Sequence, residues 1–181
     1  MNRFARIFAL ATLTLAVLGC EARTDKSDGG GILLSLSIDG WPAIISVSDP
    51  DVPPVTIEQL IVKSVVKNPG RPTSELMKVE LDKYEVTFQR DDTGTRLPPR
   101  LVENIIGSVD PGGTFTCLDC FLMRVDQFNN QPLRDMIEFG FDTETNSQVI
   151  RFRVGVQFFG KTLSGDSVET APGFFTMEVV P

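Results

Sequence analysis

Two cysteines three positions apart, Cys117 and Cys120, are the residues of this sequence with the most obvious capacity for chemistry. Such a pair can form a disulfide in an oxidising compartment, and at the N-terminus of a helix it can act as a redox pair. Here it lies within 115–125, an apolar run with strand character. In an unbroken strand three residues span ~10 Å, which exceeds the ~7 Å limit for bridged Cα atoms. Either Leu118 and Asp119 make a tight turn and the bond forms, or the two thiols face opposite sides.

The sequence contains no histidine and only three cysteines. Without histidine, a Ser-His or Cys-His nucleophile system and a His-ligated metal site are excluded. A four-cysteine zinc site cannot be completed within one chain. We therefore expect no cofactor and no metal.

Two short motifs match enzyme patterns but lack the structural context that those patterns need. Residues 155–162 fit G-x-x-x-x-G-K-[ST], which binds phosphates when a glycine-rich loop joins a strand to a helix. Here the central residues are bulky and continue a strand, so no nucleotide partner is expected. Ser64 and Lys67 fit S-x-x-K, but on a strand residues i and i+3 point to opposite sides.

Asp142, Glu144 and Asn146 place oxygen atoms at alternate positions, loosely as in a calcium loop. Ser147 stands where the turn glycine belongs, and Arg153 stands where the distal glutamate belongs. A solvated connection between strands is the better interpretation of this segment.

Other acidic residues give weaker signals. Asp49 and Asp51 flank Pro50, a pattern typical of a turn. Glu138 and Glu178 could pair as acid and base, but nothing in their spacing singles them out, and no catalytic residue is expected.

The N-terminus predicts export. Arg3 and Arg6 precede an uncharged run over 7–19, which is shorter than the ~20 apolar residues of a bilayer-spanning helix. These features are typical of a signal peptide over 1–19. Its removal leaves 15 basic and 24 acidic side chains, a net charge of −9. Such a body disfavours nucleic acid, or an anionic membrane surface, as the main partner.

The residues Val17-Leu18-Gly19-Cys20 resemble the lipobox of bacterial lipoproteins, in which a small residue precedes a cysteine. The resemblance implies diacylglycerol on the Cys20 sulfur, cleavage after Gly19, and usually a further acyl chain such as palmitate on the new N-terminus. Glu21 in place of an aspartate favours the outer membrane of a Gram-negative envelope. Residues 20–31 are polar and end in glycines, which predicts a flexible tether with a reach of roughly 18 Å.

The body, residues 32–181, has the two-residue period of half-buried strands. The clearest case is 150–158, and other strands are predicted over 33–38, 60–66, 79–88, 115–125 and 175–179. The apolar parity changes inside 79–88, which predicts a bulge near Asp82 and Lys83. Two short helices are possible, over Arg100–Ile106 and Gln131–Met136. The pattern predicts an all-β antiparallel sandwich.

This arrangement resembles bacterial lipoproteins that carry a single immunoglobulin-like or fibronectin III-like domain. The likeness rests on the strand over 84–88, the strand over 56–67 that ends in Asn68-Pro69, and a closing hairpin over 158–180. The disulfide-plus-tryptophan core of antibody domains is absent, because Trp41 comes early. The resemblance implies fold more than function, since sandwiches serve adhesion, scaffolding and binding.

Phe159 and Phe174 are predicted to face outward on the closing hairpin, where they could form a contact patch. The expected function is a lipid-anchored, non-enzymatic binding or structural role, with an envelope protein or glycan as partner. The alternative is an envelope enzyme or thiol-redox factor that uses Cys117 and Cys120. A third possibility is a carrier of a hydrophobic ligand between the sheets.

Overall fold

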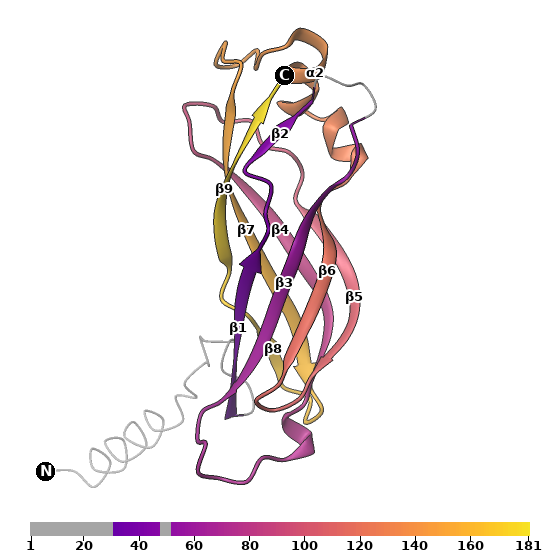
Figure 1. Cartoon of the computed structure of the whole chain (residues 1–181), viewed down its shortest axis with the longest axis vertical. Coiled ribbons are helices and arrows are strands. Elements are labelled where there is room, and N and C mark those ends of the chain that lie inside the picture. Colours follow the sequence, from indigo (N-terminus) through magenta and orange to yellow (C-terminus); the bar gives the residue numbers. More distant parts are fainter. Residues whose placement is uncertain (1–30, 48–51) are drawn as a thin grey trace, which may run out of the picture.

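The described part of the chain consists mainly of nine strands in two sheets (Figure 1). The computed structural model describes residues 31–47 and 52–181. The predicted signal peptide, the lipidated Cys20, the tether as far as residue 30, and Asp49 and Asp51 lie outside the described residues.

The smaller sheet, sheet A, contains three antiparallel strands in the order β1-β3-β6. Their bounds are β1 Ile32–Asp39, β3 Val55–Val66 and β6 Thr114–Met123. The strands predicted over 33–38, 60–66 and 115–125 are therefore confirmed.

The larger sheet, sheet B, has the order β2-β9-β7-β4-β5, with β8 paired to β7. Its strands are β2 Ile44–Ser46, β4 Val79–Arg90, β5 Leu101–Val109, β7 Ile150–Thr162, β8 Ser167–Glu169 and β9 Gly173–Val180. All pairs are antiparallel except β2 with β9. Because β1 belongs to sheet A and β2 to sheet B, the first strands carry the chain between the sheets. The result is the predicted all-β sandwich.

The core lies between the sheets and is built from alternate residues. The predicted inward set on β7 is fully buried: Ile150, Phe152, Val154, Val156 and Phe158. Sheet A contributes fully buried residues of β3, namely Ile57, Leu60 and Val62. Tyr84 of sheet B joins the layers, because its hydroxyl donates to the Phe121 carbonyl of sheet A at 3.0 Å.

The sequence predicted the irregularity in β4 correctly, and one of the two helices wrongly. Pairing of β4 with both neighbours shifts register between Leu81 and Lys83, which is the predicted bulge. The segment 100–106 is not a helix: residues 101–106 belong to β5, and Arg100 directly precedes that strand. The apolar spacing of Leu101, Ile105 and Ile106 fits a helix face, but pairing with β4 prevails over this local preference.

In the described part of the chain, three short helices lie outside the sheets. They are the 3-10 helices η3 Glu75–Met77 and η4 Val125–Asn129, and the α-helix α2 Leu133–Phe139. The helix predicted over 131–136 is confirmed as α2, although it begins two residues later, after Pro132. Gly140 ends it with a φ of 74°, a conformation that glycine adopts readily.

The sandwich is elongated, and its two ends differ (Figure 1). We call the end where β1 begins the entry end; it comprises Gly31, the loop 67–78, the hairpin turn 110–113 and the turn 163–166. The opposite end, the far end, comprises 91–100, 124–149 and the C-terminus. Within residues 31–47 and 52–181, no helix is both long and apolar enough to cross a bilayer.

Candidate functional site

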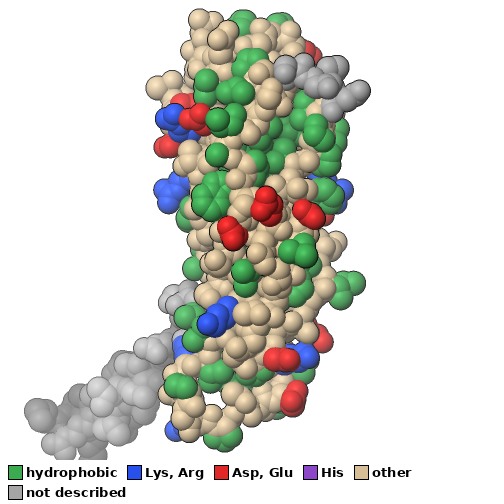
Figure 2. Space-filling view, in the orientation of Figure 1, with side chains coloured by type: hydrophobic (Ala, Val, Ile, Leu, Met, Phe, Trp, Pro, Cys, Tyr) green, Lys and Arg blue, Asp and Glu red, His purple; other side chains and the backbone are tan. Residues whose placement is uncertain are grey.

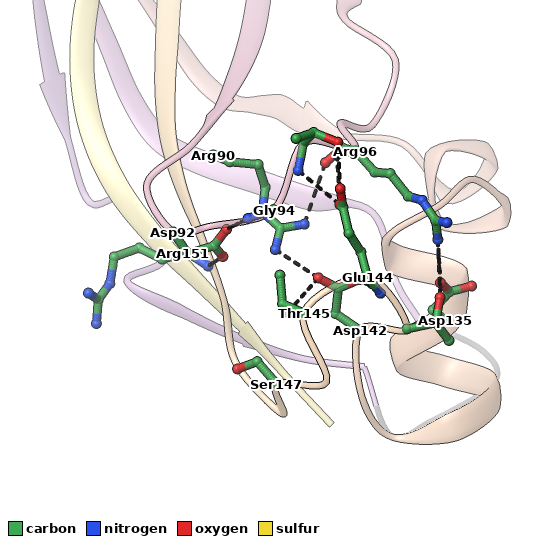
Figure 3. A network of polar contacts seen from close by, with 12 residues as sticks. Arg90, Asp92, Gly94, Arg96, Asp135, Asp142, Glu144, Thr145, Ser147 and Arg151 are labelled. Carbon is green, nitrogen blue, oxygen red and sulfur yellow. Dashed lines mark hydrogen bonds and ion pairs between the residues drawn. The ribbon is translucent and has the colours of Figure 1, made fainter.

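The far end contains a connected set of charged and polar side chains at the end of β4 (Figure 3). Arg90 is the last residue of β4, and only 4% of its side chain is exposed. Its Nε donates to Asp92 Oδ1 at 2.6 Å, and its Nη2 donates to Asp142 Oδ2 at 2.8 Å. One guanidinium therefore connects the end of a strand to two separate loops.

Asp142 is completely buried, and both of its carboxylate oxygens accept hydrogen bonds. Besides Arg90, the Thr145 hydroxyl donates to Oδ2 at 2.8 Å and the Glu144 backbone N–H donates to Oδ1 at 3.1 Å. Burial acts to raise the pKa of Asp142, but the hydrogen bonds, first of all from Arg90, outweigh it and lower that pKa. Asp142 is therefore an ionised structural residue.

Asp92 is the second acceptor of Arg90 and shapes its own loop. The Gly94 N–H donates to Oδ1 at 2.9 Å, and the Arg151 N–H at the start of β7 donates to Oδ2 at 3.1 Å. Burial again acts to raise the pKa of Asp92, and the bond from Arg90 together with the two backbone donors lowers it. The loop after β4 is thereby fixed to β7.

Glu144 joins the two far-end loops to each other. Its Oε2 accepts from the backbone N–H groups of Thr95 at 2.9 Å and Arg96 at 3.0 Å, and its Oε1 accepts from the Thr95 hydroxyl. The Thr95 hydroxyl contributes most to lowering the pKa of Glu144, to about 2, followed by these two N–H groups.

A second ion pair ties α2 to the same loops. Arg96 Nη1 lies 3.3 Å from Asp135 Oδ2, and it also donates to the Thr143 hydroxyl at 3.1 Å. Asp135 is 1% exposed and accepts further hydrogen bonds from Thr143 and Gln131. In both charged clusters the carboxylate oxygens accept hydrogen bonds from donors of the chain itself. The clusters therefore hold the loops in place. The predicted solvated connection at 142–146 is wrong for Asp142, whose oxygens are enclosed by protein donors.

Apolar side chains project into solvent around this rigid framework. Four of them are large and exposed: Leu97, Val125, Phe139 and Val149. Phe139, 55% exposed at the end of α2, also packs its ring 6.2 Å from that of Phe141. Exposed apolar groups on firmly held loops can bind a partner without first becoming ordered.

Cys117 and Cys120 are joined by a disulfide within β6, with their Cα atoms 6.0 Å apart. Asp119 adopts a φ of 51°, which turns the backbone and shortens the separation below that of an extended strand. Of the two predicted alternatives, the disulfide forms, but without the predicted tight turn: 117–120 remain within β6, and the left-handed conformation of Asp119 brings the cysteines together. Cys120 is buried and the pair lies on a strand, unlike the helix N-terminus where redox thiols are activated.

The left-handed conformation of Asp119 coincides with a change of the inward-facing side in two strands of sheet A, which we call the kink. Inward-facing residues change parity in β6 between Cys117 and Cys120, and in β3 between Ile57 and Leu60. At this level the Glu58 N–H donates to the Gly40 carbonyl, just beyond β1. Figure 2 shows a row of acidic side chains across the middle of this face.

Phe159 and Phe174 do not form one patch. Lys83 Nζ lies 5.0 Å from the ring centre of Phe159, which is partly buried, and the Arg153 guanidinium lies 4.4 Å from that of Phe174. Phe174 pairs with Gly155, four residues before Phe159 on β7, which is a separation of ~13 Å along the strand. Phe174 is exposed, as predicted, whereas Phe159 is only partly so, and each ring has a different cation beside it.

The two segments that match enzyme motifs, 155–162 and Ser64 with Lys67, lie on or next to strands, as the sequence predicted. Residues 155–162 belong to β7, which extends without interruption to Thr162 and ends in a turn. Ser64 is buried within β3, whereas Lys67 follows the end of that strand. Neither motif therefore has the loop-to-helix or one-face geometry that its chemistry requires.

Glu138 and Glu178 lie on different elements, and each forms an ion pair with its own arginine. Glu138 lies 3.4 Å from Arg134 on α2, and Glu178 of β9 lies 2.6 Å from Arg151 of β7. They do not form an acid–base pair.

Sequence reasoning missed Arg90, Asp92 and Asp135 as parts of a common framework. Arg90 and Asp142 are 52 residues apart, and no local motif links them. The one available signal was the position of Arg90 and Asp92 at a strand end followed by Gly94, which predicted a turn but not its partners.

Comparison of the sequence with known protein families finds no match, and no curated protein is significantly similar to it.

Proposed function

We propose that the protein is a lipid-anchored component of a bacterial cell envelope, acylated at Cys20, whose far end binds an envelope protein or glycan without catalysis. The anchor would place it in the outer membrane. The observation that carries the proposal is the arrangement of the two ends: the chain enters the sandwich at one end, and its most elaborate loops lie at the other.

The distances support this polarity. Ten residues, 21–30, lie between Cys20 and the described chain, and these eleven residue steps could span ~40 Å at most if fully extended. β3 has 12 residues and so extends ~40 Å along the sandwich. An anchored molecule would hold its entry end near the bilayer and direct its far end away from it.

The chemistry of the far end favours binding over catalysis. Asp92, Asp142 and Glu144 all have lowered pKa values, so each is ionised at neutral pH and is held by donors of the chain. Such groups neither donate nor accept a proton readily near neutrality. Exposed apolar side chains such as Phe139 and Val125 are what remains available to a partner.

The experiment is co-purification from membranes solubilised in mild detergent, followed by mass spectrometry. The wild type, carrying a C-terminal tag on a long linker, is compared with Cys20→Ala and Phe139→Ser. Phe174→Ser, on the sheet face, is the matched control. We expect an acylated Cys20, a soluble Cys20→Ala variant, and a stoichiometric partner that Phe139→Ser loses and Phe174→Ser keeps.

Two results would contradict the proposal. If Cys20→Ala stayed in the membrane and the wild type carried no acyl group, Cys20 would not be a lipid anchor. A partner lost by Phe174→Ser but kept by Phe139→Ser would move the binding surface from the far end to sheet B.

A further inference from the structure

We infer that the entry end rests directly on a phospholipid surface, with Leu76 and Leu163 inserted at its interface. This inference rests on the proposed anchor at Cys20 and adds a second, non-covalent membrane contact. It begins with two leucines that the fold exposes on adjacent turns.

Leu76 lies on η3 and is 57% exposed, and Leu163 lies just after β7 and is 45% exposed. Their turns are hydrogen-bonded to each other. The Leu163 N–H donates to the Lys78 carbonyl at 2.9 Å, and the Ser164 N–H donates to the Leu76 carbonyl at 3.1 Å. The two side chains are therefore presented by one fixed unit, and inserting them requires no rearrangement of the backbone.

The charge of the entry end differs from that of the whole chain. The entry end has no net charge, because Lys67, Arg71 and Lys78 balance Glu75, Asp110 and Asp166, whereas the complete chain has a net charge of −7. Figure 1 shows the loop after β3 forming the tip of the entry end, and Figure 2 shows apolar side chains at this end. An end without net negative charge can approach lipid headgroups, where exposed leucines can insert and Lys67 and Arg71 can meet lipid phosphates. The excess acid elsewhere would turn the rest of the molecule away from the same surface.

The place where the described chain begins indicates that a bilayer is the partner of these two leucines. Gly31 lies beside the loop and η3, because the Lys67 N–H donates to its carbonyl at 3.2 Å and a side chain at position 31 would meet Met77. Cys20 is eleven residues upstream. Two or three acyl chains at Cys20 would hold this end, and no other, continuously close to lipid.

The first test uses the acylated protein in vesicles of phosphatidylethanolamine and phosphatidylglycerol. An environment-sensitive dye is attached at Leu76→Cys, or at Leu97→Cys on the far end as the matched control, and a quencher is carried by the lipid. We expect quenching at position 76 and none at 97. Equal fluorescence at both positions from a protein that mass spectrometry shows to be acylated would overturn the inference while leaving the anchor intact.

The second test removes the anchor. Chain 20–181 carrying Cys20→Ser is sedimented with the same vesicles, alone and with Leu76→Ser/Leu163→Ser. Because each leucine is about half exposed, we expect the double substitution to lower the partition coefficient about tenfold. The far-end pair Leu97→Ser/Phe139→Ser should leave it unchanged. Equal losses from the two pairs, or no vesicle binding at all, would refute the lipid contact. Leucine-dependent binding together with an unmodified Cys20 would instead refute the anchor alone.

Discussion

At the residue scale, Arg90 shows how a buried charge can organise loops. Removing an arginine and two carboxylates from water is unfavourable, and the attraction between them compensates only if the remaining donors and acceptors are satisfied. Here Gly94, Thr145, Glu144 and Arg151 supply the further donors to Asp92 and Asp142. Removing any one member should therefore leave a buried charge without its partner.

Asp142→Ala should destabilise the protein by about 3–5 kcal/mol, because Arg90 would remain buried with one of its two carboxylates missing. Glu138→Ala is the control, since its ion pair with Arg134 is half-exposed and should contribute less than about 0.5 kcal/mol. Urea unfolding measures both values. A loss below about 1 kcal/mol for Asp142→Ala would mean that the ion pair does not hold the far end together.

Glu144 should make the stability of the fold depend on pH in the acid range. Its pKa is about 2 in the folded protein, against ~4.3 in an unfolded chain. A carboxyl group with a depressed folded pKa stabilises the fold above its unfolded pKa and loses that contribution as the pH falls through the folded value. The melting temperature should therefore fall between pH 4.5 and pH 2, a window set by these two values. Glu144→Gln should melt lower at pH 7 and change less over this window; an unchanged slope would contradict the assignment.

The limits of sequence reasoning are clearest for these same residues. Asp142 and Glu144 were recognisable as an oxygen-rich segment, and the missing glycine at Ser147 argued against calcium. Their actual partners, Arg90 and Thr95, lie about fifty residues away, and only the packing of β4 against β7 brings them together. Long-range pairing of charges leaves no periodic trace in a single sequence.

At the element scale, alternation was informative where one face of a strand is buried. β7 follows its predicted pattern throughout, and the parity change in β4 located a bulge. β5 was misassigned because it is an edge strand: Val102 and Ile106 face solvent, so its apolar residues do not alternate cleanly. The kink at Asp119 had a signal in the cysteine spacing, but that spacing alone left two geometries open.

The disulfide should stabilise this kink modestly. Closing so short a loop restricts the unfolded chain little, so Cys117→Ala/Cys120→Ala should reduce the free energy of unfolding by about 2 kcal/mol. Reduction of the wild type should give a similar loss. Thermal unfolding with and without reductant measures it. Identical melting curves would show that the bond contributes nothing to the fold.

At the scale of the whole molecule, a single core joins the two sheets. Tyr84 bridges the layers, and Trp41, in the crossover from β1 to β2, packs its ring 5.6 Å from that of Phe175 on β9. The crossover is therefore part of the same packing unit as the sheets. A domain built in this way should unfold as one body.

We expect one cooperative transition. Trp41 is the single tryptophan of the sequence, so its fluorescence reports on the crossover, whereas far-ultraviolet circular dichroism reports on the strands. In urea the two signals should have the same midpoint. A tryptophan transition at clearly lower urea would show that the crossover opens independently of the sandwich.

The kink in sheet A also bears on crowding. β6 is an outer strand of its sheet, and such strands offer unpaired backbone groups that can template pairing with another copy. Molecules anchored as proposed would meet repeatedly in the same orientation, which would raise this risk. Asp119, held by the neighbouring disulfide, departs from extended backbone midway along β6, and such an irregularity disfavours a regular ladder with another copy. A feature that shapes one sheet would thus also keep neighbouring copies from merging into a shared aggregate.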